Sequence, residues 1–71
     1  MVACLENLHS FFGEPVRLTH EVDLENGAAV EDYHIFIAGK NLRGDGHTFH
    51  EAVEEITKKA GVESLPFPIP N

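Results

Sequence analysis

The spacing of apolar side chains changes along the chain, and each change predicts a different element. Over residues 2–12 the apolar positions recur every three or four residues, which predicts a helix with one buried stripe. Gly13 suits a left-handed cap after this helix, and Pro15 cannot continue it. From 16 to 25 apolar and polar residues alternate, which predicts a half-buried strand. Its apolar face comprises Val16, Leu18, Val22 and Leu24.

The residues after this strand predict an antiparallel partner. Asn26-Gly27 tolerates positive φ angles at both positions of a two-residue hairpin turn. The partner strand is expected in the β-branched and aromatic segment Tyr33–Ala38, which is apolar on both faces, whereas residues 28–32 are expected to form a longer loop or a bulge. A short third strand is expected at 41–43, after which the glycines of segment 44–46 turn the chain.

The clearest element is a helix that begins near Phe49 and ends at Gly61. Thr48 and Glu51 have the spacing of a capping box, in which the hydroxyl accepts from the third helical N–H and the carboxylate reaches back to the cap N–H. Two glutamate–lysine pairs spaced four residues apart support the same helix: Glu54 with Lys58, and Glu55 with Lys59.

These elements predict a small single α+β domain over residues 1–63, in the order helix, strand, strand, short strand, helix, with an antiparallel sheet and both helices on one face. Residues 64–71 alternate proline with apolar side chains and predict a Pro-rich extended C-terminal strap. The uncovered face of Tyr33–Ala38 would be covered by this strap or by a second copy of the chain. The predicted core comprises Leu5, Leu8, Phe12, Val16, Leu18, Val22, Ile35, Ile37, Phe49, Val53 and Ile56.

The charge balance narrows the classes of partner. The 71 residues carry twelve Asp and Glu against five Lys and Arg, a formal charge of −7. Such a charge disfavours nucleic acid and anionic membranes as partners. No apolar run approaches the roughly 20 residues of a membrane span. The one cysteine, Cys4, cannot form an internal disulfide, so the expected compartment is the cytoplasm.

The residues that could carry catalysis or bind a metal lack the required spacing. The run 47–51 reads His-Thr-Phe-His-Glu, which is not the His-Glu-x-x-His order of a zinc hydrolase. Cys4 lies on an apolar helix stripe without a basic neighbour, and neither serine stands in a Gly-x-Ser-x-Gly elbow. Segment 39–46 lacks the Gly-Lys-Ser/Thr ending of a phosphate loop. We therefore expect no catalytic residue, no metal and no cofactor, and hence no enzyme.

Two segments resemble the double-stranded-RNA-binding domain. Phe11-Phe12-Gly13-Glu14-Pro15-Val16 is similar to that family's Gly-x-Pro-Val entry to its first strand. Gly44-Asp45-Gly46-His47-Thr48-Phe49-His50-Glu51-Ala52-Val53 matches the glycines, the hydroxyl and the alanine of its Gly-x-Gly-x-Ser-Lys-Lys-x-Ala-Lys signature. The resemblance implies the family's fold, with both helices on one face of the sheet. Phe49, His50 and Val53 replace the three lysines that grip RNA phosphates in the family.

Other resemblances point to inhibitors. Gly46-His47-Thr48-Phe49-His50-Glu51-Ala52 is similar to the Gly-Asp-Thr-x-x-Glu-Ala motif of HicB antitoxins, within a match over roughly residues 16–60. The short, acidic, cysteine-poor composition is also similar to that of small phage-encoded inhibitors of nucleases and CRISPR effectors. Both resemblances imply a protein that acts by binding another protein.

The sequence therefore predicts a non-catalytic acidic protein-binding module, a small inhibitor or antitoxin-like, phage-type protein that docks on a basic, nucleic-acid-handling partner. The candidate contact residues are carboxylates of the first strand and the last helix: Glu21, Asp23, Glu25, Glu51, Glu54 and Glu55. Three alternatives stay open. The acidic surface could serve solubility alone, the chain could homodimerise through the Tyr33–Ala38 strand, or it could be a degenerate domain that binds RNA weakly through five scattered cations: Arg17, Lys40, Arg43, Lys58 and Lys59.

Overall fold

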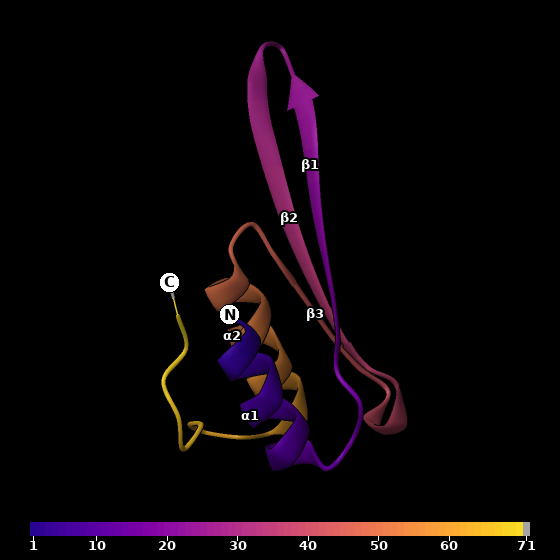
Figure 1. The fold of residues 1–71 in the computed structure, drawn as a ribbon, viewed down its shortest axis with the longest axis vertical. Helices are drawn as coiled ribbons and strands as arrows, with labels where there is room; N and C mark the ends of the chain where they lie inside the picture. Colours follow the sequence, from indigo (N-terminus) through magenta and orange to yellow (C-terminus); the bar gives the residue numbers. More distant parts are fainter. Residues whose placement is uncertain (71) are drawn as a thin grey trace.

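In a computed structural model of the chain, which describes residues 1–70, two helices pack on one face of a three-stranded antiparallel sheet (Figure 1). The elements are α1 (Val2–Phe12), β1 (Arg17–Glu25), β2 (Ala28–Ile37), the 3-10 turn η1 (Ala38–Lys40), β3 (Leu42–Gly46) and α2 (Phe49–Ala60). The strands lie in the order β1-β2-β3, with β2 in the centre. The predicted α+β class, the order of elements and the placement of both helices on one face are confirmed.

Local sequence signals set the ends of the helices. Gly13 and Gly61 end α1 and α2 in the left-handed conformation, with φ of 69° and 74°. At the start of α2 the Thr48 hydroxyl accepts a hydrogen bond from the Glu51 N–H at 3.1 Å, as predicted. The Glu51 carboxylate accepts from the His47 N–H at 2.9 Å, one residue before the N–H that a capping box uses. The carboxylate still satisfies a backbone donor at the helix start.

The hairpin between β1 and β2 is tighter and longer than the sequence predicts. Asn26 and Gly27 form the two-residue turn with φ of 51° and 79°, as expected. Residues 28–32 are not a loop or a bulge, because β1 pairs with β2 along its entire length. Because the turn contains only Asn26 and Gly27, the pairing of β2 with β1 begins immediately after Gly27.

The glycines of β3 allow close contact between the strand and α2, and the expected turn at these residues is wrong. A Cβ on Gly44 would overlap the backbone oxygen of Ala52, and a Cβ on Gly46 would crowd the side chain of Glu51. Both glycines lie within β3, where their missing side chains let the helix backbone approach the sheet. The chain turns after β3, at the bends of His47 and Thr48 that lead into α2, whereas η1 and Asn41 connect β2 to β3.

The hydrophobic core lies between the sheet and the helices. Its buried side chains are Cys4, Leu8, Ile35, Ile37, Phe49, Ala52, Val53 and Ile56. Four further residues of the predicted core are half-buried around it: Leu5, Phe12, Val16 and Leu18. The prediction is wrong for Val22, which is 57% exposed.

Val22 is exposed because the outer half of the hairpin extends beyond both helices (Figure 1). β3 pairs only with residues 33–37 of β2, so residues 21–32 form a two-stranded ribbon that we call the arm. Leu24, on the same face of the arm as Val22, is 80% exposed. The 12-residue helix α2 is about 18 Å long, whereas the nine-residue strand β1 spans about 30 Å. The helices therefore cover only the inner half of the hairpin.

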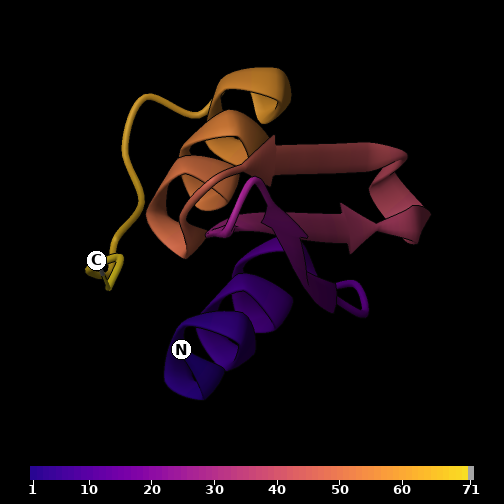
Figure 2. The ribbon, with the colours of Figure 1, turned by 90° about the horizontal axis from the view of Figure 1, so that it is seen from above.

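The C-terminal strap lies on the far side of the helices from the sheet (Figure 2). Leu65, Phe67 and Ile69 are partly buried against the core, and the Phe67 ring lies 6.4 Å from that of Phe11. The expectation that the strap covers the second face of Tyr33–Ala38 is therefore wrong, because its apolar side chains are used on the helices. Asn71, the last residue of the predicted strap, lies outside the described residues. Among residues 1–70, no helix is long and apolar enough to cross a membrane.

Candidate functional site

The sheet face opposite the helices, which we call the open face, carries charges that change sign along the strands. Side chains of β2 alternate between the two faces, so that Ile35 and Ile37 are buried against the helices while His34 and Phe36 lie on the open face. The segment Tyr33–Ala38 is expected from its sequence to be apolar on both faces, but on the open face of β2 Phe36 is its one large apolar side chain. Three successive rows across the strands, running toward the arm, are Arg17–Phe36–Arg43, Thr19–His34–Asp45 and Glu21–Asp32.

His34 connects all three strands on the open face. Its Nε2 lies 3.0 Å from Glu21 Oε1 on β1, and its Nδ1 is hydrogen-bonded to Asp45 Oδ1 on β3. Arg43 Nε donates to the same Asp45 oxygen at 3.0 Å. The hydrogen bond with Asp45 raises the pKa of His34, and the same bond lowers the pKa of Asp45. This geometry favours the imidazolium form, which can donate to both carboxylates at once.

The three predicted carboxylates of the first strand lie in one row on the open face, but their surroundings differ. Glu21 is engaged by His34. Asp23 and Glu25 continue the row toward the tip of the arm, and within residues 1–70 neither takes part in an ion pair. No Lys or Arg occurs between positions 18 and 39, so the arm itself holds no basic side chain that could compensate their charges.

The predicted carboxylates of α2 are more fully occupied. Glu51 accepts from the backbone at the helix start. Glu54 Oε1 lies 3.3 Å from His50 Nε2, so its expected pairing with Lys58 is replaced by a pair with the preceding turn. Glu55 lies 3.2 Å from Lys59 Nζ, as predicted.

The strand and helix carboxylates, which the sequence leaves as two separate groups, are joined by a chain of contacts. Glu21 contacts His34, and His34 is bonded to Asp45. The backbone N–H of Asp45 donates to Glu55 Oε1 at 3.3 Å. Asp45, which sequence reasoning did not select, is therefore the residue that connects the two groups. Its place on β3 becomes apparent only once the register with β2 is known.

The cations that are scattered in the sequence gather at the end of the molecule opposite the arm. Arg17 and Arg43 flank Phe36, which is 41% exposed. Lys40 lies in the adjoining turn η1, and Lys59 Nζ donates to the backbone oxygen of Arg43 at 2.7 Å. We call these four cations the cationic end. No local signal in the sequence predicts this grouping, because it depends on the register of all three strands.

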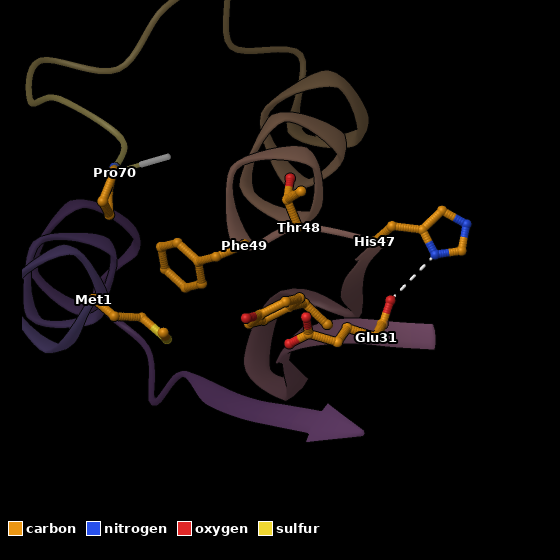
Figure 3. A pocket seen from close by; sticks show the side chains of 7 residues that line it. Met1, Glu31, His47, Thr48, Phe49 and Pro70 are labelled. Carbon is orange, nitrogen blue, oxygen red and sulfur yellow. Dashed lines mark hydrogen bonds between the residues drawn. The ribbon is translucent and has the colours of Figure 1, made fainter. Parts of the chain in front are cut away.

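A hollow of about 320 Å³ lies beneath the arm (Figure 3), lined by Met1, Glu31, Tyr33, His47, Thr48, Phe49 and Pro70. His47 Nδ1 contacts the backbone oxygen of Glu31 at 3.2 Å and Asp32 Oδ1 at 3.1 Å. The Thr48 hydroxyl accepts the cap hydrogen bond of α2. The hydroxyls among these lining residues belong to Tyr33 and Thr48, and neither is hydrogen-bonded to a histidine or a carboxylate.

The remaining candidates for chemistry are the Cys4 thiol and a metal site. Cys4 is buried in the core, and burial raises the pKa of its thiol. Across residues 1–70, no group of three or more His, Cys, Asp or Glu side chains is arranged to hold a metal ion. No protein family, curated protein or solved structure matches the chain.

Proposed function

We propose that the chain is a non-catalytic protein-binding module, a small inhibitor or antitoxin-like protein of the phage type, that docks on a basic, nucleic-acid-handling partner in the cytoplasm. The observation that carries the proposal is the arm, which extends beyond the helices (Figure 1) and offers five carboxylates and no Lys or Arg over residues 21–32. A ribbon of two strands gains little from the core, so its length is better explained by contact with a partner.

The acidic row gives this contact an electrostatic driving force. Glu21, Asp23 and Glu25 follow one another at intervals of about 7 Å along one face of β1. At that distance each neighbouring pair of like charges repels by about 0.6 kcal/mol even in bulk water. A basic surface laid against the row would replace this repulsion by attraction and would accelerate association. Val22 and Leu24, exposed on the other face of the arm, would add an apolar contact.

The carboxylates of α2 have a secondary part in the proposal. Glu51, Glu54 and Glu55 already hold a helix cap, a histidine and a lysine, so a partner would have to compete with these contacts. Contact through Asp23 and Glu25 requires no such exchange. The strand row is therefore the centre of the proposed docking surface, and the helix carboxylates form its margin.

The test compares two double variants of equal charge. Asp23→Ser with Glu25→Ser removes the arm carboxylates and keeps Glu21, because that residue also contacts His34. Glu6→Ser with Glu63→Ser removes two exposed carboxylates outside the sheet as the control. Basic proteins captured from host-cell extract by the wild type should be lost by the arm variant and kept by the control.

The same comparison should then be made with a captured partner by measuring association rates at two salt concentrations. We expect the arm variant to associate more slowly and with a weaker salt dependence than the control. Equal capture and equal salt dependence for the two variants would show that the acidic row serves solubility alone.

A second candidate function is weak RNA binding, which the gathering of Arg17, Lys40, Arg43 and Lys59 at the cationic end favours. The formal charge of −7 opposes it. We expect no micromolar binding of double-stranded RNA or DNA at about 150 mM salt, measured by fluorescence anisotropy. A micromolar, salt-sensitive complex that is lost when Arg17 and Arg43 are changed to Gln would favour this candidate instead.

A further inference from the structure

We propose that the open face is a self-association surface on which two copies of the chain pack face to face and antiparallel, so that Arg17 of each copy lies opposite Asp23 of the other. The proposal goes beyond the docking role proposed for the acidic row, because it gives the same carboxylates a second contact, Arg17 at the cationic end of another copy of the chain. Phe36 and Val30, which share the open face of β2, would meet on either side of the two-fold axis, which passes between the rows of His34 and Asp32.

The order of charges along β1 determines the direction of packing. On the open face the strand presents Arg17 first, then Thr19, and then three carboxylates: Glu21, Asp23 and Glu25. If two such rows face each other in parallel, arginine lies against arginine and carboxylate against carboxylate. If they face each other in antiparallel directions, each arginine meets a carboxylate. Because a two-fold axis relates the copies in this antiparallel arrangement, the contact between Arg17 and Asp23 occurs twice in one interface.

The neighbouring strand supports the same register. Arg17 pairs with Phe36 across the β1–β2 ladder, and Asp23 pairs with Val30. Placing Arg17 of one copy opposite Asp23 of the other therefore places Phe36, which is 41% exposed, opposite Val30 of the second copy. It also places His34 opposite Asp32, the partner of Glu21 in the ladder. The aromatic, the cationic and the acidic positions are thus complementary in a single register.

The size of the face predicts a weak dimer. Three strands about 4.8 Å apart, one of them about 30 Å long, present an open face of the order of 400 Å² per copy. A stable interface of standard size buries about 800 Å² per partner. Charge complementarity and one exposed aromatic ring would therefore hold a dimer that forms at high protein concentration and low salt.

The decisive experiment reverses one charge on each side of the proposed contact and measures molecular mass by analytical ultracentrifugation. Arg17→Glu places two acids opposite each other in its own dimer, and Asp23→Arg places two arginines opposite each other. In an equimolar mixture of the two variants, both contacts are again between opposite charges. Lys58→Glu and Glu63→Arg are the matched controls, since both residues are exposed and lie outside the sheet. Circular dichroism verifies that each variant is folded.

We expect the wild type to shift from monomer to dimer between about 10 µM and 1 mM at low salt, with loss of the dimer at high salt. Each variant of the open face should remain a monomer, their mixture should recover the dimer, and the two controls should behave as the wild type. A wild type that stays monomeric throughout would overturn the proposal, as would a dimer that both reversals leave intact, or a mixture that stays monomeric.

These outcomes are distinct from failure of the proposed function. A monomeric wild type that still captures basic proteins through Asp23 and Glu25 would refute self-association and keep the docking role. A dimer restored by the mixed reversals would support self-association, whether or not a further basic protein is captured.

Discussion

Ile56 and Leu24 are isomeric side chains in opposite surroundings, which makes them a matched pair for testing where the core ends. Ile56 is fully buried between α2 and the sheet, whereas Leu24 on the arm is 80% exposed. Truncation to Ala removes three carbon atoms from each side chain. If the arm lies outside the core, the two changes should have very different effects on the free energy of unfolding.

The expected magnitudes follow from burial. Three buried carbons contribute about 2.4 kcal/mol at about 0.8 kcal/mol each, and the remaining cavity brings the loss for Ile56→Ala to about 2–5 kcal/mol. A 71-residue domain has a total stability of about 4–11 kcal/mol, so this single change removes a large part of it. Leu24 buries only a fifth of its surface, which limits the loss for Leu24→Ala to about 0.5 kcal/mol.

Urea denaturation, followed by circular dichroism at a protein concentration low enough to exclude self-association, measures both losses. With a slope of about 1 kcal/mol per molar urea, the midpoint should fall by about 2 M or more for Ile56→Ala and by about 0.5 M or less for Leu24→Ala. Equal shifts for the two variants would refute the conclusion that the arm projects from the core. An unchanged midpoint for Ile56→Ala would refute the position of α2 itself.

Three further predictions follow from single contacts. Because the hydrogen bond with Asp45 raises the pKa of His34, the stability from this bond is complete below the unfolded pKa of about 6.5 and is lost as the pH rises through the higher folded value. The stability difference between wild type and His34→Gln should therefore shrink from pH 6 to pH 9, and a constant difference in urea midpoint would contradict it. Gly44→Ala should destabilise the fold by about 1–3 kcal/mol, because the added Cβ overlaps the backbone of α2, and an unchanged thermal midpoint would show that the helix lies further from β3. Thr48→Ala should reduce the free energy of unfolding by about 0.5–2 kcal/mol through loss of the helix cap, measured by thermal denaturation, whereas Thr48→Ser should retain most of it.

Elements whose ends depend on local chemistry could be predicted from the sequence. The bounds of α2 follow from the Thr48 hydroxyl and from Gly61, which act on the residues next to them. The turn at Asn26-Gly27 is equally local. Period-two alternation correctly predicts which side chains of β1 share a face, but it does not predict which of them a second layer covers. The lengths of the predicted elements contain that information, since 12 helical residues cannot cover a nine-residue strand.

In the candidate site, too, the sequence predicts what one strand determines but not what depends on pairing between strands. The row formed by Glu21, Asp23 and Glu25 follows from alternation within one strand, and the structure keeps it on one face. The His34–Asp45 contact and the row that joins Arg17 to Arg43 depend on pairing between strands that are distant in the sequence. The glycines of β3 were ambiguous for a related reason, because a turn and a close helix contact require the same absence of a side chain.

Because β2 passes without interruption from the core into the arm, one strand contains two regions with different opening free energies. Residues 33–37 are paired on both sides, and their amide hydrogens should exchange with solvent only when the whole domain unfolds. Residues 28–32 are paired only with β1, so the arm can separate and close while the core stays intact. A bound partner would suppress this local fraying, and part of its binding free energy would be spent on ordering the ribbon. Slowed exchange confined to the arm would therefore report binding even where no other part of the molecule changes.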